Sequence, residues 1–172
     1  MAKLLEGKLI AEKIKEEIKQ QVQLMNKKPI LASVLVGDNA GAEAYVKSQK
    51  KTAENLGIEY QFHKLDKNIT EEKLIEFVKE LNRDASVNGI IMQMPLPPQI
   101  DYKKISQYIL PEKDVEGMHP ANIGKIVFGK AKILPCTSAA VMELLNSTGI
   151  DLYGKEVVVV GHNEIVGKPL AL

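Results

Sequence analysis

The sequence has one cysteine, no tryptophan and no long apolar run. Its single cysteine, Cys136, excludes an internal disulfide framework of the kind that holds small secreted domains together. No apolar stretch approaches the roughly 18 residues of a membrane-spanning helix, and the N-terminus lacks the pattern of a signal peptide. We therefore expect a cytoplasmic protein without a membrane partner.

The sequence also lacks an excess of charge of one sign, because 23 basic side chains stand against 22 acidic ones for a formal net charge of +1. A protein that binds nucleic acid normally shows a basic excess on one face. We therefore expect a small-molecule ligand and no nucleic-acid partner. The chain is 45% apolar over 172 residues, and a chain of this length can bury about two-thirds of its unfolded surface.

Strand and helix patterns alternate three times in the first half of the chain. Apolar residues recur at helical spacing in some segments, and short apolar or alternating runs between them indicate strands. The economical topology is an α/β fold with a parallel sheet, right-handed crossovers and helices on both faces. The predicted strands cover residues 30–36, 58–62 and 89–92, and the predicted helices cover 8–25, 42–56 and 71–81.

Prolines and glycines interrupt residues 95–135, where only residues 102–110 have a helical pattern. A loop-rich stretch of this length in a compact domain is usually functional or a linker. Thr137 then caps a predicted helix that runs to Leu145. Residues 156–161 are the most strand-like run of the chain, and we expect them to open a second unit.

A polar residue, Gln93, ends the third predicted strand and is followed by the proline-rich residues 94–97. Ligands of open α/β sheets collect beyond the carboxyl ends of the strands, and a carboxamide can both donate and accept hydrogen bonds. Termination of the strand by proline is the simpler explanation of the same pattern. On the second predicted helix, Tyr45 and Gln49 lie four residues apart on one face. The lysines around them are typical of a solvated surface.

Two acids, Asp114 and Glu116, stand two residues apart in the loop-rich stretch. Such a pair can bind a guanidine-like edge of a ligand or assist proton transfer. His119 precedes a proline, and we expect it to be structural. Neither His63 nor Cys136 has a partner at the spacing of metal ligands, so we predict no metal site.

A glycine-bounded turn at residues 161–167 follows the last strand-like run and precedes a helix start. In a doubly wound fold, glycines at this place let the backbone approach a dinucleotide phosphate, and the helix N-terminus offers free N–H groups. An ordinary strand-to-helix turn explains the run equally well, because its spacing is not G-x-G-x-x-G.

Five segments stand in one order along the chain: AYVKSQKK (44–51), IIMQMPLP (90–97), PEKDVEGMHPANIGK (111–125), ILPCTSAAVMELL (133–145) and VVVVGHNEIVGKP (157–169). Together they resemble the methylenetetrahydrofolate dehydrogenase/methenyltetrahydrofolate cyclohydrolase family. The resemblance implies two α/β domains with folate in the cleft between them, NADP or NAD on a Rossmann-type domain, and usually a homodimer. It implies hydride transfer from 5,10-methylenetetrahydrofolate to the nicotinamide, then hydrolysis of the methenyl product to 10-formyltetrahydrofolate, without a metal.

The resemblance also assigns roles to particular residues. It implies that Tyr45 packs against and orients the folate, and that Gln93 is the active-site glutamine of the family. Glu116 stands where the family has the aspartate that holds the pterin. The implied site residues are Tyr45, Gln49 and Gln93 in catalysis, Tyr45, Gln93, Asp114 and Glu116 in substrate binding, and Gly161, His162, Asn163, Ile165 and Gly167 in cofactor binding.

The chain departs from the family at several of these positions. Gln49 stands where the family has a catalytic lysine, and a carboxamide has no comparable charge or titration. Lys50 lies about 100° further round the helix and is a poor geometric substitute. We therefore predict hydride transfer with weak or absent cyclohydrolase activity. A non-catalytic folate-binding relative and an unrelated nucleotide-binding module are the alternative hypotheses.

Two further departures concern the cofactor domain. His162-Asn163 replaces an Arg-Ser pair, which weakens the case for NADP and leaves NAD plausible. The Pro and Gly that usually follow PCT are absent at Ser138-Ala139-Ala140. We predict a folate-binding domain over residues 1–146 and an incomplete Rossmann-type domain over 147–172, as expected of a fragment of a longer enzyme.

Overall fold

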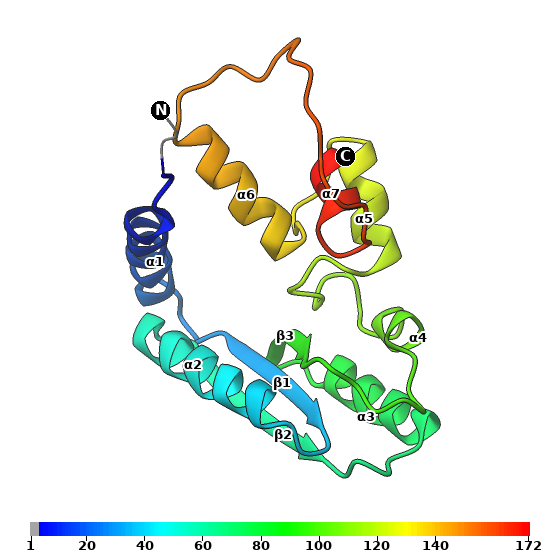
Figure 1. The fold of residues 1–172 in the computed structure, drawn as a ribbon. Coiled ribbons are helices and arrows are strands. Elements are labelled where there is room, and N and C mark those ends of the chain that lie inside the picture. The colour runs from blue at the N-terminus through cyan, green and yellow to red at the C-terminus, as the bar shows by residue number, and fades with distance from the viewer. Residues whose placement is uncertain (1–3) are drawn as a thin grey trace. The chain divides into compact units, whose positions relative to one another are not determined.

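The computed structural model describes residues 4–172 (Figure 1). The chain divides into two compact units, of which one comprises residues 16–115 and the other comprises residues 116–172 with the N-terminal segment through Lys15. Helix α1 (Gly7–Gln23) matches the predicted first helix. The domain boundary expected after residue 146 stays a prediction.

The unit of residues 16–115 is built on a three-stranded sheet. Its strands are β1 (Ile30–Val36), β2 (Glu59–Leu65) and β3 (Val87–Met92), all parallel and arranged in the order β2-β1-β3. The central strand β1 is buried from Ala32 to Val36. The predicted parallel α/β fold is therefore confirmed, with β1 as the strand that is covered on both faces.

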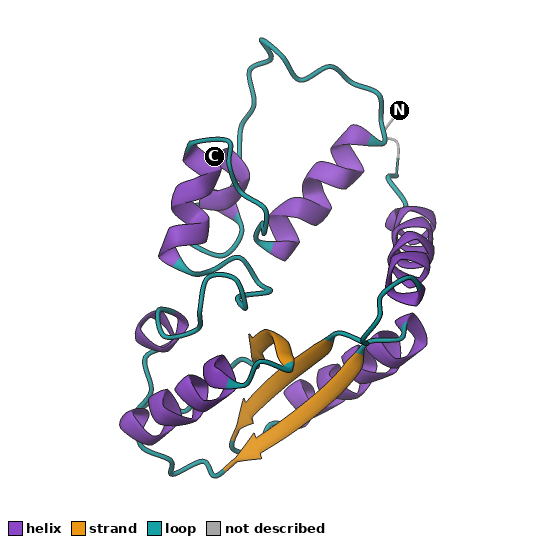
Figure 2. Ribbon diagram, turned by 180° about the vertical axis from the view of Figure 1, so that it is seen from behind, coloured by secondary structure: helices purple, strands orange, loops and turns teal. Residues whose placement is uncertain are grey.

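Helices cover the two faces of this sheet (Figures 1 and 2). Helix α2 (Ala40–Leu56) lies on one face, where its Val46 and Ala53 pack against Tyr60 of β2. Helix α3 (Glu71–Arg83) lies on the other, where its buried Leu74 and Val78 join the core made by alternate residues of β1. Because side chains alternate across a strand, the intervening residues of β1 face α2.

The predicted end of α2 and the predicted start of α3 agree with the capping groups, whereas α2 begins two residues before its predicted start and α3 ends two residues after its predicted end. Gly57 ends α2 in the left-handed conformation at φ 84°, with its N–H bonded to carbonyls of the last turn. Asn39 caps the start of α2, and the Thr70 side chain accepts from the Lys73 N–H at the start of α3.

The loop-rich region contains more helix than the sequence predicts. Helix α4 (Tyr102–Ser106) is shorter than the predicted 102–110. Helix α5 (Pro120–Val127) is an additional element, so the prediction of a single helix in this region is wrong. Proline is tolerated in the first turn of a helix, where its missing N–H has no intrahelical partner, and His119 Nδ1 accepts from the Ala121 N–H at 3.0 Å.

Two predictions near the C-terminus are also wrong. Helix α6 (Cys136–Asn146) begins before Thr137, with Pro135 as its cap residue and no side-chain capping bond. Residues 156–160 form no strand, and Val158 and Val160 are 87% and 97% exposed. A parallel strand needs a hydrogen-bonded neighbour, and no other described segment supplies one. Helix α7 (Gly167–Ala171) follows the glycine-bounded turn.

Candidate active site

The clearest polar cluster of the sheet unit lies between β1, α2 and the end of β3. Gln93 directly follows β3, and its backbone N–H still bonds to the Val34 carbonyl at 2.8 Å, which extends the ladder one residue past the strand. The Gln93 side chain is 3% exposed. The sheet therefore fixes Gln93 at its carboxyl edge, where ligands of α/β folds bind.

Hydrogen bonds join Gln93 to β1 and α2. Gln93 Nε2 donates to Ser33 Oγ at 3.0 Å and to Gln49 Oε1 at 2.7 Å. The same Gln49 oxygen accepts from the Tyr60 hydroxyl at 3.1 Å. We call Ser33, Gln49, Tyr60 and Gln93 the carboxamide cluster. It brings together the two predicted catalytic glutamines, and it contains no charged side chain.

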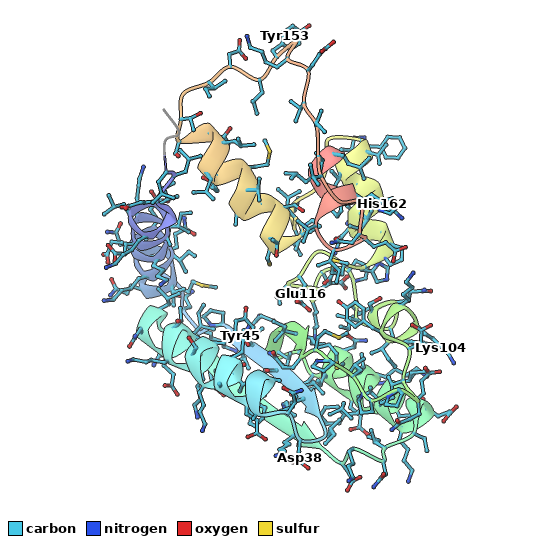
Figure 3. The ribbon with its side chains drawn as sticks, viewed as in Figure 1. Asp38, Tyr45, Lys104, Glu116, Tyr153 and His162 are labelled. Carbon is cyan, nitrogen blue, oxygen red and sulfur yellow. The ribbon has the colours of Figure 1, made fainter. Side chains whose placement is uncertain are left out.

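Tyr45 stands one helical turn before Gln49 on α2. Its neighbour Val46 is buried in the core, which orients the helix so that Tyr45 remains 59% exposed (Figure 3). An exposed aromatic ring beside a polar cluster offers a flat apolar surface to a planar ligand. The i, i+4 spacing thus places Tyr45 and Gln49 together, as the sequence predicts.

Asp114 is held against the sheet. The carbonyl of Lys113 accepts from the Ile90 N–H of β3 at 2.7 Å, Asp114 pairs with Ile90 as an isolated parallel bridge, and Asp114 is 4% exposed. The Lys113 ammonium donates to the Leu81, Asn82 and Asp84 carbonyls at 2.7–3.0 Å. Lys113 therefore holds the segment around Asp114 against the C-terminal end of α3.

Glu116 belongs to the other compact unit, and its predicted role in ligand binding stays a prediction. The next residue, Gly117, has φ 68°, and a side chain there would meet the backbone of Leu134 and Pro135 at 2.6–2.9 Å. Glycine is required at position 117 because the backbone there is left-handed, and because the backbone of Leu134 and Pro135 leaves no room for a side chain. The chain after Glu116 is thereby packed against the start of α6.

The turn at 161–167 is organised by Asn163. Its Oδ1 accepts from the backbone N–H groups of Ile165, Val166 and Gly167 at 3.2, 2.7 and 3.4 Å. The free N–H groups that the sequence suggests for a phosphate are therefore engaged by the chain's own side chain. His162 is exposed.

Two further contacts close this turn. A side chain at Gly167 would collide with the Gly161 carbonyl, so the two glycines lie face to face. The Ser138 hydroxyl donates to the Val166 carbonyl at 2.9 Å. Ser138 thus ties the start of α6 to the turn.

Ser33 and Tyr60 are the members of the carboxamide cluster that the sequence does not identify. Ser33 is the only polar residue in the apolar strand ILASVLV, and that is the one signal that could have found it. Among residues 4–172, no group of three or more His, Cys, Asp or Glu side chains is placed to hold a metal ion. No described helix has both the length and the apolar character needed to cross a membrane.

The comparisons with known proteins agree on one family. Residues 5–116 match the family "Tetrahydrofolate dehydrogenase/cyclohydrolase, catalytic domain", and residues 135–172 match its "NAD(P)-binding domain". The chain is 47% identical over 174 aligned residues to the "Bifunctional protein FolD" of Acetivibrio thermocellus, covering 99% of this chain and 61% of that one.

Solved structures agree with this match. The bifunctional dehydrogenase/cyclohydrolase of Campylobacter jejuni has a TM-score of 0.95 at 43% identity, over 98% of this chain and 61% of that one. The Trypanosoma brucei enzyme, solved with NADP cofactor and inhibitor, has a TM-score of 0.90 at 33% identity, over 99% and 60%. The chain thus spans about three-fifths of the length of these relatives. It belongs to the tetrahydrofolate dehydrogenase/cyclohydrolase family.

Proposed function

We propose that the protein works in one-carbon folate metabolism, oxidising 5,10-methylenetetrahydrofolate to 5,10-methenyltetrahydrofolate with NADP or NAD, and that it hydrolyses the methenyl product weakly or not at all. The observation that carries the proposal is the carboxamide cluster, in which Gln49 and Gln93 are joined at the carboxyl edge of the sheet. The names of the relatives support the folate substrate and the reaction.

Four residues hold the folate in this proposal. The exposed ring of Tyr45 packs on the flat pterin, and Gln93 offers its carboxamide to the polar edge of the ring. Asp114 and Glu116 supply carboxylates for the amino-pyrimidine part of the pterin, whose donors match carboxylate oxygens. Glu116 is one methylene longer than aspartate, which moves its carboxylate further from the backbone.

The hydrolysis step needs a group that activates water, and Gln49 cannot do so. A carboxamide neither titrates nor carries charge near neutral pH, and the Gln49 oxygen already accepts two hydrogen bonds. Lys50 is exposed on another face of α2, where its ammonium lies 3.8 Å from Glu54. The cluster therefore retains the means to orient a ligand and lacks a base.

The cofactor residues in this proposal are Gly161, His162, Asn163, Ile165 and Gly167. The glycine pair leaves the turn without side-chain bulk, which suits a ligand that lies against the backbone. A nicotinamide cofactor held at this turn would supply the hydride acceptor for the reaction. A histidine at position 162 binds a 2′-phosphate less well than the bidentate guanidinium of arginine, which leaves NAD and NADP both to be tested.

We also propose that the protein is a cytoplasmic homodimer. The single cysteine fits a reducing compartment. Strand β2 is an edge of the described sheet, and the unpaired N–H and C=O groups of an edge strand are a template for pairing with a second chain. Light scattering after size-exclusion chromatography checks the dimer, and a monomeric mass at micromolar concentration contradicts it.

The proposal is tested by steady-state turnover of the full-length protein with 5,10-methylenetetrahydrofolate and each cofactor. We expect reduction of at least one nicotinamide cofactor. The matched variant Lys50→Gln should leave turnover within about twofold, because Lys50 faces away from the cluster.

A non-catalytic folate-binding role is the second candidate, favoured by the engagement of three turn N–H groups with Asn163. Tight binding of tetrahydrofolate without turnover by either cofactor would select that role. Binding of nucleotide without binding of folate would exclude both candidates.

A further inference from the structure

The hydrogen bonds of the carboxamide cluster fix which way each amide faces. Gln49 Oε1 accepts from the Tyr60 hydroxyl and from Gln93 Nε2, so both of its lone pairs are used. Gln93 Nε2 donates to Gln49 Oε1 and to Ser33 Oγ, so both of its protons are used. Within residues 4–172, the Gln49 amino group and the Gln93 carbonyl oxygen make no side-chain hydrogen bond.

Tyr60 is well placed to act on Gln49. Tyr60 pairs with Leu31 of β1, and Ser33 lies two residues further along the same strand, on the same face. Tyr60 is 7% exposed beneath α2, packed with Val46 and Ala53. Its hydroxyl therefore reaches Gln49 from the side of α2 that faces the sheet.

The tyrosine remains a donor at neutral pH. Burial raises the pKa of the Tyr60 hydroxyl, and hydrogen bonding with Ser33 acts in the opposite direction. In this arrangement the protonated Tyr60 phenol donates to the Gln49 oxygen, and turning the Gln49 amide alone would set its amino group against the Gln93 amino group and lose the hydrogen bond between them.

We propose that Tyr60 is a positioning residue that holds the Gln49 carboxamide with its amino group toward the ligand, so that Gln49 and Gln93 present a neutral donor and acceptor side by side. A ligand at this edge then brings an acceptor to Gln49 and a donor to Gln93. The inference rests on the proposed function for the identity of the ligand. The orientation itself is a property of the ligand-free protein.

The test is a double-mutant cycle in the full-length protein with tetrahydrofolate as the probe. Tyr60→Phe removes only the hydroxyl, and we expect about threefold to tenfold weaker binding by titration calorimetry, as for loss of one hydrogen bond. In a Gln49→Ala background, Tyr60→Phe should change the dissociation constant by less than about 1.5-fold, because Tyr60 acts through Gln49. The control Tyr153→Phe, at a residue that is 93% exposed, should change nothing in either background.

A second measurement needs no ligand. In the ¹H–¹⁵N spectrum of the side-chain amides, Tyr60→Phe should move the Gln49 signals, while Tyr153→Phe should leave them in place. Equal weakening of tetrahydrofolate binding in both backgrounds, or Gln49 signals that do not move, would overturn the positioning role. Gln49 signals that move in a protein that does not bind tetrahydrofolate would instead overturn the proposed function and leave the orientation intact.

Discussion

Among single residues, Gln49 has the largest consequence for chemistry. It occupies the helix position that the family resemblance assigns to a lysine, and it is fixed by two hydrogen bonds to its oxygen. An ammonium cannot accept either bond, because it has donors only. The Gln49 amide therefore makes two hydrogen bonds that a lysine at this position would have to replace with bonds that it donates.

The sequence predicts some of these residues and misses others for a physical reason. Tyr45 and Gln49 are found from helical spacing, and Gln93 from its place at the end of a strand. Ser33 and Tyr60 lie 60 and 11 residues from their partners in the chain. Their roles depend on the register of β1 against its neighbours β2 and β3, which no local sequence pattern predicts.

Gly117 gives a prediction for stability. Gly117→Ala places a methyl group against the Leu134 and Pro135 backbone and in a left-handed conformation. It should lower the free energy of unfolding by roughly 2 kcal/mol or more, measured by urea denaturation of the full-length protein. Gly124→Ala is the matched control, because Gly124 lies in α5 with open space around it, and it should raise stability by up to about 1 kcal/mol. Equal effects of the two substitutions would contradict the close approach.

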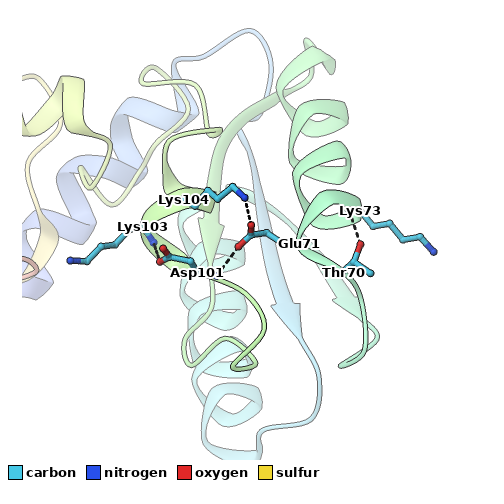
Figure 4. A network of polar contacts seen from close by, with 6 residues as sticks. All are labelled: Thr70, Glu71, Lys73, Asp101, Lys103 and Lys104. Atoms are coloured by element: carbon cyan, nitrogen blue, oxygen red, sulfur yellow. Dashed lines mark hydrogen bonds and ion pairs between the residues drawn. The ribbon is translucent and has the colours of Figure 1, made fainter.

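Between elements, one carboxylate links the start of α3 to the start of α4 by polar contacts (Figure 4), beside the apolar packing of the two helices in the core. Glu71, in the first turn of α3, accepts from the Lys104 ammonium and from the Asp101 N–H, the latter at 3.0 Å. The hydrogen bond from Lys104, followed by that from the Asp101 backbone, lowers the pKa of Glu71 below its ordinary value of 4.5. The ionised carboxylate thus ties together two helices that are 30 residues apart in the chain.

This contact predicts a dependence of stability on pH. Because the pKa of Glu71 is lower in the folded protein than in the unfolded chain, its contribution is present above the unfolded value and is lost as pH falls through the folded value. Glu71→Gln should therefore destabilise the protein at pH 7, and the difference from wild type should shrink below about pH 4.5. Urea denaturation of both proteins at a series of pH values measures this difference in the free energy of unfolding.

Glu72→Gln is the control for that prediction, because Glu72 is exposed in the same helical turn and has the same relation to the helix dipole. It should change stability far less at every pH. A similar loss for both substitutions would assign the effect to the dipole and not to the α3–α4 contact.

The elements themselves differ in how far local sequence determines them. The three strands and α2 and α3 follow from periodicity and capping residues, and the structure confirms them. Residues 156–160 have the strongest strand composition of the chain and form no strand, because β structure needs a partner that these residues do not have among the described segments. Composition can show the preference of a segment, whereas pairing decides its structure.

For the molecule as a whole, the sheet unit is a complete parallel α/β layer with its own core, whereas the other unit has helices and a turn but no sheet. The chain spans about three-fifths of its relatives, and its last 38 residues match part of an NAD(P)-binding domain. Most of the residues proposed to bind folate, Tyr45, Gln93 and Asp114, belong to the sheet unit. Hydride transfer also requires the cofactor residues of the second match.

In the proposed function, Gln49 separates hydride transfer from hydrolysis. The most direct test measures both rates on one sample of the full-length protein, following reduced nicotinamide for the first and the absorbance decay of methenyltetrahydrofolate for the second. We expect hydride transfer with hydrolysis near the uncatalysed rate in the wild-type protein. In Gln49→Lys we expect at least about tenfold faster hydrolysis, with hydride transfer within about threefold. Rapid hydrolysis by the wild-type protein that is unchanged in Gln49→Lys would show that Gln49 does not separate the two reactions.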